Sequence, residues 1–165
     1  METLAMSKVQ NVEAVGDSGN DGTNGFLNIV DVDIQTLWAS DGYLDVYVEF
    51  DMQIAVKTAA FAVRLPGTSH SPKDVKLELS NTGHTGPWSL AAEIQFFGTD
   101  RWQFFEIPTF AIGYRYARLF VVDSYASYNV RISEVEFCQH VVGTRVSPAV
   151  HQYPRGAVAG VSECN

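Results

Sequence analysis

Apolar and polar residues alternate over several stretches of the chain. In residues 44–51 every second residue, from Leu44 to Phe50, is apolar, and residues 75–79 show the same period of two. This period is typical of strands with one buried face. No window of useful length has the 3.6-residue apolar period of an amphipathic helix. Further strands are predicted near residues 54–65, 89–97, 102–107, 115–123 and 128–137.

Polar segments rich in glycine, proline, asparagine and aspartate separate these strands. Such turn signals recur at intervals of about 8 to 12 residues, which is typical of an all-β sandwich or barrel. Loops of this composition can project binding groups from a rigid scaffold. The segments are residues 16–25, 39–43, 66–72, 81–88 and 98–101.

The length and composition fit one domain with a packed core. The chain has 165 residues, of which 46% are hydrophobic and 18% charged, so global disorder is not expected. We place the domain at residues 1–137 and interpret residues 138–165 as a C-terminal arm or linker, because strand signals fade there. The two cysteines, Cys138 and Cys164, either form a disulfide bond or remain free thiols.

The net charge of −8 limits the classes of partner. Nucleic acids and anionic membranes both require a cationic face, so neither is expected as a partner. The apolar runs are short, and no membrane span is expected. The first residues lack the basic and apolar regions of a signal peptide, so the chain is either cytosolic or begins after processing.

The segment that follows the first long loop carries acidic residues in a pattern that suits a metal ion. We call residues 31–36 the acidic turn; it contains Asp31, Asp33 and Thr36. Calcium binds six to eight oxygen atoms, many of them backbone carbonyls, and a turn of this kind can supply them. The same residues also suit solvated or capping positions, so the pattern alone leaves both interpretations open.

The last predicted strand of the domain raises the question of a buried acid. Val130 and Ile132 share one side of this strand, whereas Val135 and Phe137 share the other. If the strand is regular, Glu134 points inward and needs a partner, because an unpaired buried carboxylate is costly. A bulge that turns this side chain outward is one alternative. A metal ion between it and the acidic turn is the other.

Short motifs follow one another along the chain in a characteristic order. They are Thr3-Leu4-Ala5, the loop of residues 16–25, Asp31-x-Asp33-x-x-Thr36-x-Trp38, Ser80-x-x-Gly83 with Trp88, Arg115-Tyr116-x-Arg118-Leu119, and Ile132-x-Glu134-x-Glu136-Phe137. This ordered set resembles the discoidin family, also called factor V/VIII type C domains. The closest branch is the one found as carbohydrate-binding modules beside polysaccharide-degrading enzymes, and the resemblance spans roughly residues 3–137. It implies a jelly-roll β-sandwich.

The resemblance also implies a structural calcium ion. In the family, the acidic turn and a glutamate of the last strand hold this ion. The residues implicated here are Asp31, Asp33, Thr36 and Glu134, with backbone carbonyls near Asn28. One departure concerns Val32, which stands where the family usually has glycine between the two acids. A β-branched residue resists a positive φ, so a turn that needs this conformation would be distorted.

Family members that bind sugars do so in shallow loops at one rim of the jelly roll. The run from Arg64 to His70 resembles the segment in which a strand-ending arginine and a loop residue contact galactose-type sugars. Arginine presents a fixed fork of donors for hydroxyl groups. Arg64 and His70 are therefore the first candidates, the alternative being an arginine that pairs with a neighbouring acid.

Aromatic and basic residues of other loops extend this list of candidates. Sugar rings present an apolar face to aromatic side chains. Trp38 is expected in the core. The further candidates in or beside loops are Tyr43, His84 and Trp102, with Tyr125 and Tyr128 as additional exposed aromatic residues.

Catalysis is not expected from the motifs present. The sequence contains no Gly-x-Ser-x-Gly, no His-Glu-x-x-His and no phosphate-binding glycine loop. We therefore expect a non-catalytic module that binds a glycan or polysaccharide and holds a structural calcium ion. The alternative is a module that binds a protein partner within a larger assembly. An extracellular location would suit the first and a cytosolic location the second.

Overall fold

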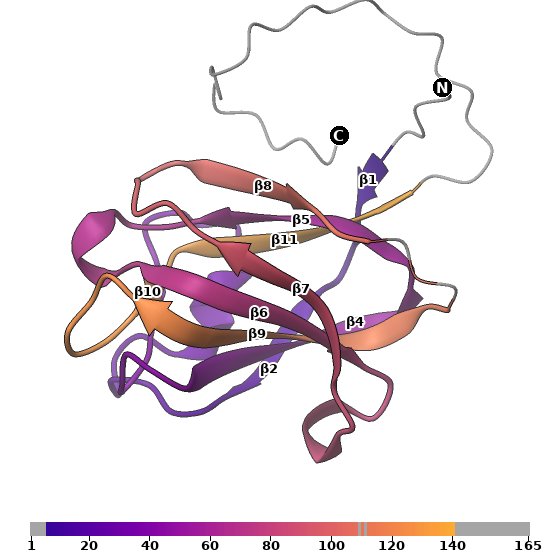
Figure 1. Ribbon diagram of the computed structural model, residues 1–165, viewed down its shortest axis with the longest axis horizontal. Helices are drawn as coiled ribbons and strands as arrows, with labels where there is room; N and C mark the ends of the chain where they lie inside the picture. The colour runs from indigo at the N-terminus through magenta and orange to yellow at the C-terminus, as the bar shows by residue number, and fades with distance from the viewer. Residues whose placement is uncertain (1–5, 109, 111, 141–165) are drawn as a thin grey trace, which may run out of the picture.

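Two antiparallel sheets lie face to face in the computed structural model, which describes residues 6–108, 110 and 112–140 (Figure 1). The five-stranded sheet has the order β2 (Glu13–Asp17), β4 (Val46–Val56), β9 (Tyr114–Ser124), β6 (Pro72–Ser80) and β7 (Ser89–Gln95). The four-stranded sheet has the order β1 (Met6–Lys8), β11 (Glu134–His140), β5 (Thr58–Arg64) and β8 (Trp102–Glu106). This arrangement confirms the predicted all-β jelly-roll sandwich.

Short elements complete the fold. A two-stranded ladder joins β3 (Trp38–Ala39) to β10 (Arg131–Ile132). Three 3-10 helices lie in loops: η1 (Phe26–Ile29), η2 (Thr68–His70) and η3 (Gly83–Thr85). Within the described part of the chain, no helix has the length and apolarity needed to cross a membrane.

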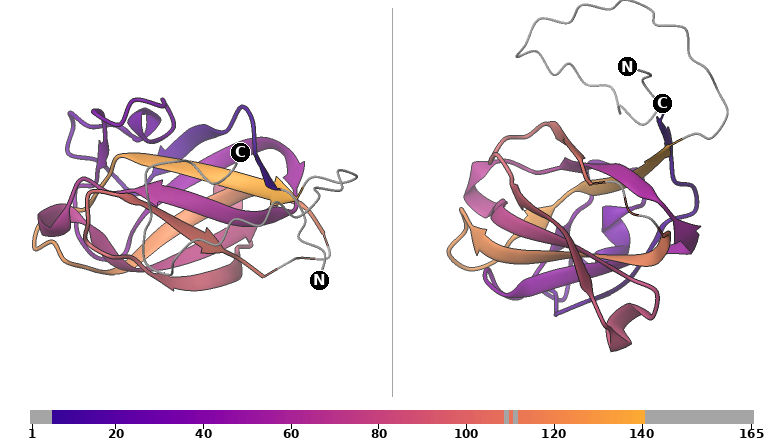
Figure 2. Two further views of the ribbon diagram at one scale, coloured as in Figure 1. Left: turned by 90° about the horizontal axis from the view of Figure 1, so that it is seen from above. Right: turned by 45° about the vertical axis from the view of Figure 1, so that its right-hand side comes forward.

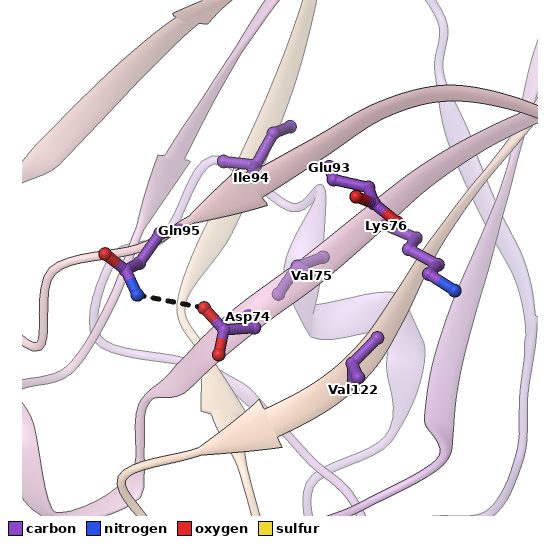
Figure 3. Close-up of a pocket in the computed structure, with 7 residues that line it drawn as sticks. All are labelled: Asp74, Val75, Lys76, Glu93, Ile94, Gln95 and Val122. Carbon is purple, nitrogen blue, oxygen red and sulfur yellow. Dashed lines mark hydrogen bonds between the residues drawn. The ribbon is translucent and has the colours of Figure 1, made fainter.

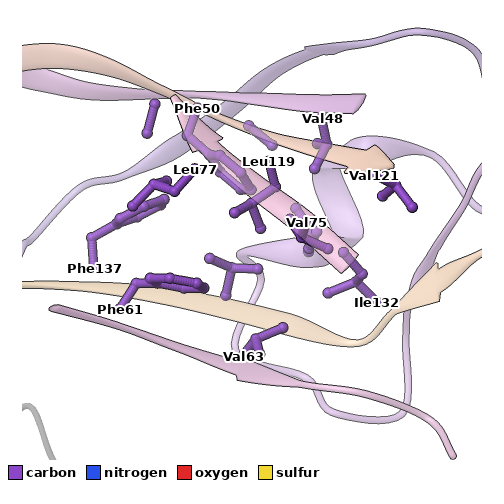
Figure 4. Close-up of a cluster of buried hydrophobic side chains, with 14 of the residues drawn as sticks. Val48, Phe50, Phe61, Val63, Val75, Leu77, Leu119, Val121, Ile132 and Phe137 are labelled. Carbon is purple, nitrogen blue, oxygen red and sulfur yellow. The ribbon is translucent and has the colours of Figure 1, made fainter. Parts of the chain in front are cut away.

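The core lies between the two sheets and follows from the predicted alternation. Val48 and Phe50 of β4 are fully buried, as are Phe61 of β5 and Phe137 of β11 (Figure 4). The rings of Phe50 and Phe137 meet edge to face with 5.2 Å between their centroids. Burial of each such side chain contributes about 1.5–3 kcal/mol. Trp38 is also fully buried, as predicted.

The segment predicted as one strand near residues 128–137 is divided in two. The chain leaves the ladder with β3 after Ile132 and enters the four-stranded sheet at Glu134. Between them, the backbone N–H of Ser133 donates to the carbonyl of Arg64 at 2.9 Å. This change of sheet explains why the residues of this segment that lie in the core between the sheets are even-numbered up to Ile132 and odd-numbered at Val135 and Phe137.

The last strand extends past the predicted domain boundary by three residues. Cys138, Gln139 and His140 pair with β1, which lies beside β11 in all views (Figure 2). Cys138 is fully buried and disulfide-bonded. Residues 141–165, with the predicted arm and Cys164, lie outside the described residues.

The strand connections place the loops at two opposite ends of the sandwich. Strand β6 begins just after η2 and ends just before η3, so η2 and η3 lie at opposite ends. At the η2 end, the backbone N–H of Tyr125 donates to Ser71 O at 3.0 Å, and that of Ser40 donates to Val130 O at 3.0 Å. These bonds hold several loops together at one end of the molecule, which we call the rim.

Candidate functional site

The rim is assembled from loops that lie far apart in the sequence. The hydroxyl of Ser40 accepts the backbone N–H of Val130 at 3.0 Å, across 90 residues of chain. The backbone N–H of Asp21 donates to Ala39 O at 3.0 Å, which ties a further loop to the same place. The four segments that form the rim are residues 17–24, 39–45, 65–71 and 125–131.

His70 lies at the centre of the polar groups on the rim. Its Nδ1 lies 2.8 Å from the hydroxyl of Ser69, and its Nε2 contacts the phenol oxygen of Tyr128. The two rings meet edge to face with 5.0 Å between centroids. Burial lowers the pKa of His70 from its usual value, and the positive charge of Arg131 lowers it further. His70 is therefore neutral at neutral pH, and it can donate and accept hydrogen bonds.

Arg131 and Asn129 carry polar atoms that the described residues leave unpaired. Arg131 Nε and Asn129 Oδ1 are buried and have no hydrogen-bond partner within the part of the chain that the structure describes. Unpaired buried polar atoms are costly, so they are uncommon in folded proteins. Here one donor and one acceptor of this kind lie two residues apart in the rim. Both atoms lie below the surface, so a hydroxyl-bearing ligand would reach them only if side chains of the rim rearranged.

Arg131 also lies between two loops of the rim. The pKa of Asp21 is lowered chiefly by hydrogen bonds from Asn24 and in addition by the charge of Arg131, which lowers the pKa of His70 as well. One guanidinium therefore acts on a carboxylate and on an imidazole from different loops. The rim offers donors and acceptors close together, which is the pattern that binds adjacent hydroxyl groups.

Exposed aromatic rings accompany these polar groups. Tyr43, Tyr125 and Tyr128 on the rim segments are 40%, 46% and 57% exposed. The phenol oxygen of Tyr125 donates to Phe96 O at 3.2 Å, which fixes that ring. Tyrosine combines an apolar face with a polar tip, so such rings can cover the apolar face of a sugar.

Arg64 and Trp102 lie at the same end of the sandwich but on the outer face of the four-stranded sheet. They are cross-strand neighbours at the meeting point of β5 and β8. Arg64 Nη2 donates to Asp100 Oδ1 at 2.8 Å, and the Asp100 side chain is 64% exposed. The pairing of Arg64 with an acid corresponds to the alternative stated for this arginine, whose side chain is half-buried.

His84 lies away from the other predicted binding residues. It belongs to η3, which follows β6 at the end opposite the rim. Its charge acts on Glu49, in the middle of β4. The structure therefore brings Tyr43 and His70 together at the rim, places Arg64 and Trp102 beside it, and leaves His84 elsewhere.

The acidic turn folds around the hydroxyl of Thr36. Thr36 Oγ1 lies 2.7 Å from Asp31 Oδ2, 2.8 Å from Asp33 O and 3.4 Å from Asn28 O. Asn28 Nδ2 donates to Leu37 O at 3.0 Å, which closes the base of the turn. Carboxylate, hydroxyl and carbonyl oxygens thus converge on one side of the turn.

Glu134 lies beside this group of oxygens. The backbone N–H of Val32 donates to Glu134 Oε2 at 3.2 Å, and Glu134 is only 2% exposed. Burial, reinforced by the nearby charge of Asp31, raises the pKa of Glu134 to about 8. Glu134 is therefore buried and faces the turn, on the opposite side of β11 from the core residues Val135 and Phe137. Whether a metal ion bridges it to the turn stays a prediction.

The donor set fits a calcium ion better than a transition metal. No group of three or more histidine, cysteine, aspartate or glutamate side chains suited to a metal occurs among the described residues. The oxygens around Thr36 and Glu134 are hard donors, and several come from the backbone, as calcium prefers. A divalent cation would also offset the repulsion between Asp31 and Glu134. Asp33 Oδ1 accepts the backbone N–H of Gln35 at 2.9 Å, so this side chain shapes the turn.

Val32 adopts the conformation that glycine would adopt most easily. Its φ is +69°, in the left-handed region. This region costs an L-residue roughly 1–2 kcal/mol. The turn therefore keeps its shape despite the departure at this position, and its N–H still reaches Glu134.

Sequence reasoning did not identify Asn129 and Arg131 as binding residues. Both belong to a segment predicted as a regular strand, where polar residues normally face solvent. The change of sheet at Ser133 moves them into the rim. The sequence does hold one signal that could have indicated this segment, which is an arginine next to the point where the apolar residues change sides of the predicted strand.

Solved structures with the same fold were found, although sequence comparison found none. No protein-family model and no curated relative matches the chain. The family 32 carbohydrate-binding module of Clostridium perfringens NanJ, in complex with galactose, aligns with a TM-score of 0.67 and 14% identity, over 81% of this chain and 99% of that one. A putative chitobiase fragment from Bacteroides thetaiotaomicron gives a TM-score of 0.67 and 16% identity, over 86% and 97%.

A third solved structure binds an acidic sugar. The family 32 module of AlyQ, in complex with 4,5-unsaturated mannuronic acid, aligns with a TM-score of 0.63 and 19% identity, over 80% of this chain and 96% of that one. At these identities the similarity shows the fold. The chain therefore has the same jelly-roll fold as these modules, a fold compatible with the discoidin resemblance.

Proposed function

We propose that this protein is a non-catalytic module that binds a glycan at the rim. The observation that carries the proposal is the unpaired buried pair of Arg131 Nε and Asn129 Oδ1 beside His70. A sugar presents adjacent hydroxyl groups that both donate and accept, and such groups would satisfy a donor and an acceptor at once.

Each rim residue has a separate role in this proposal. Arg131 donates to sugar hydroxyl groups, and Asn129 accepts from them. Neutral His70 has both ring nitrogens in contact with the hydroxyl groups of Ser69 and Tyr128, so it positions these two hydroxyl groups on the rim. Tyr43 and Tyr128 cover the apolar face of the ring, since both are exposed on the rim. Arg64, with Asp100 and Trp102, forms an outer contact for a second sugar unit.

The solved neighbours support a carbohydrate ligand. The module of NanJ is in complex with galactose, and that of AlyQ with an unsaturated mannuronic acid. We extend only the class of ligand to this chain, because the identities are low.

We further propose that the acidic turn holds a structural calcium ion. Asp31, Thr36, Glu134 and the carbonyl oxygens of Asn28 and Asp33 are the ligands that the geometry supports. The ion would supply positive charge between the buried carboxylate of Glu134 and the exposed carboxylate of Asp31. It would thereby fix the turn against β11 and stabilise the fold, with no part in ligand chemistry.

A glycan array, run with calcium and again with chelator, tests the proposed function. Native protein should bind a class of glycan selectively, and Arg131→Ala should lose the signal while it keeps its thermal stability. A blank array from folded native protein would contradict glycan binding and favour the alternative of a protein partner.

A further inference from the structure

A second surface with binding features lies on the outer face of the five-stranded sheet. A groove of about 320 Å³ is formed there by three neighbouring strands, β7, β6 and β9 (Figure 3). Its position on a sheet face separates it from the loops of the rim. Seven residues line it: Asp74, Val75, Lys76, Glu93, Ile94, Gln95 and Val122.

Register shifts occur in both ladders of β6 beside this groove, and two of them flank it. In the ladder of β6 with β9, Asp74 pairs with Asp123 and Val75 with Val121, so Val122 is an extra residue. In the ladder of β6 with β7, Leu77 pairs with Ala92 and Glu78 with Leu90, which leaves one extra residue on β7. Bulges bend and twist strands locally, and they often re-aim side chains beside binding sites. The groove lies between the two bulges.

The side chains in the groove include a cation without an ion pair. Lys73 pairs with Asp123 at 2.7 Å and with Asp74 at 3.5 Å. In contrast, no ion pair formed by the described residues includes Lys76, although Glu93 is its cross-strand neighbour. Lys76 extends from β6 on the side of Val122 (Figure 3). Its three donors are thus available to a ligand.

Acceptors and an apolar wall complete the groove. Gln95 Nε2 donates to Asp74 Oδ1 at 3.0 Å, which fixes an amide and a carboxylate at one end of the groove. Val122 is 41% exposed on the side of β9, and half-buried Phe120, the cross-strand partner of Lys76, continues the apolar surface. The lining therefore alternates donors, acceptors and apolar patches, which matches the edges and faces of sugar rings.

We propose that this groove is a second glycan-binding surface, which holds an internal stretch of a neutral polysaccharide chain. Two carboxylates, Asp74 and Glu93, outweigh the one ammonium of Lys76, so the groove disfavours an anionic polymer. It lies across three neighbouring strands of a sheet face, whereas the rim is formed by four loop segments. A continuous chain therefore suits the groove, and a single sugar unit suits the rim.

Residue-resolved NMR titration of the intact 165-residue protein tests this proposal. The probes are cellohexaose, xylohexaose and β-1,4-linked galactohexaose, with hexamannuronate as the anionic counterpart. At least one neutral hexasaccharide should shift the amide signals of Lys76, Glu93 and Val122, and hexamannuronate should not. The double variant Lys76→Ala/Glu93→Ala should weaken this binding at least fivefold. The exposed control Lys57→Ala should leave it unchanged.

The rim variant separates this proposal from the proposed function. Arg131→Ala should leave the groove shifts in place, because the groove contains no rim residue. Shifts confined to the rim would contradict glycan binding in the groove and support glycan binding at the rim. Shifts confined to the groove would contradict glycan binding at the rim and support glycan binding in the groove. If no saccharide shifts the groove signals, the groove is not a glycan surface and its bulges serve a protein contact instead.

Discussion

The rim and the acidic turn are built by opposite means. The contacts of Thr36 with Asp31 and Asp33 span five and three residues of sequence, so the turn forms locally. The rim contact of His70 with Tyr128 spans 58 residues, and that of Ser40 with Val130 spans 90. The difference teaches that a short motif can specify the local shape of a turn, whereas the rim forms only after distant segments of the sandwich have come together.

The two regions also use buried polar groups differently. At the turn, the buried carboxylate of Glu134 receives the N–H of Val32 and faces a second acid, an arrangement that calls for a cation. At the rim, buried atoms of Asn129 and Arg131 lack partners within the described residues, an arrangement that calls for hydroxyl groups. The turn should therefore control stability and the rim should control affinity.

The largest expected effect is the loss of glycan affinity in Arg131→Ala. Hydrogen bonds to charged groups contribute about 1.5–3 kcal/mol, so affinity should fall by about 10- to 150-fold. Arg64→Ala should reduce affinity by less than about fivefold, because exposed ion pairs contribute little. Isothermal titration with the glycan identified on the array measures both, with the exposed Arg101→Ala as the control. A greater loss of affinity in Arg64→Ala than in Arg131→Ala would show that Arg64 makes the main contact with the sugar and Arg131 the outer one.

Calcium should raise the melting temperature without raising glycan affinity. A ligand at 100 times its Kd stabilises the folded state by about 2.7 kcal/mol, which corresponds to roughly 5–10 °C for a chain of this size. Differential scanning calorimetry in calcium and in chelator measures the change. Glu134→Gln should abolish it, whereas exposed Glu106→Gln should keep it. An equal shift in Glu134→Gln would show that calcium binds elsewhere.

The same contrast explains what the sequence could predict. The fold was predictable because alternation in β4 and β6 encodes which side chains are buried, as Val48 and Leu77 show. The local shape of the acidic turn was also predictable, because its contacts span only three to eight residues, whereas the contact of Glu134 with the turn spans 102 residues. Whether this turn binds calcium, and whether Arg64 and His70 bind sugar, stay predictions. Arg131 could not be recognised, because its place in the rim depends on a change of sheet at Ser133.

Val32→Gly should stabilise the turn by a smaller amount. Glycine adopts the left-handed conformation of this position without the strain that valine has there, which gains roughly 1–2 kcal/mol. The greater freedom of glycine in the unfolded chain offsets part of this gain. A net increase of about 0.5–1 kcal/mol in unfolding free energy is expected, measured by urea denaturation with and without calcium. Ile34→Gly, at a neighbouring position whose φ is not positive, should give no increase. Destabilisation by Val32→Gly would mean that the valine side chain stabilises the turn.

The smallest effect is the pH dependence of glycan binding at the rim. The pKa of His70 lies below its usual value of 6.5, so the imidazole is neutral at pH 7 and gains its proton only in more acidic solution. Protonation removes an acceptor and adds a positive charge beside Arg131. Affinity should therefore be constant from pH 8 to pH 6.5 and fall about threefold at lower pH, since one neutral hydrogen bond contributes about 0.5–1.5 kcal/mol. His70→Gln should bind more weakly but without this decline, and a decline that persisted in the variant would assign the titration to another group.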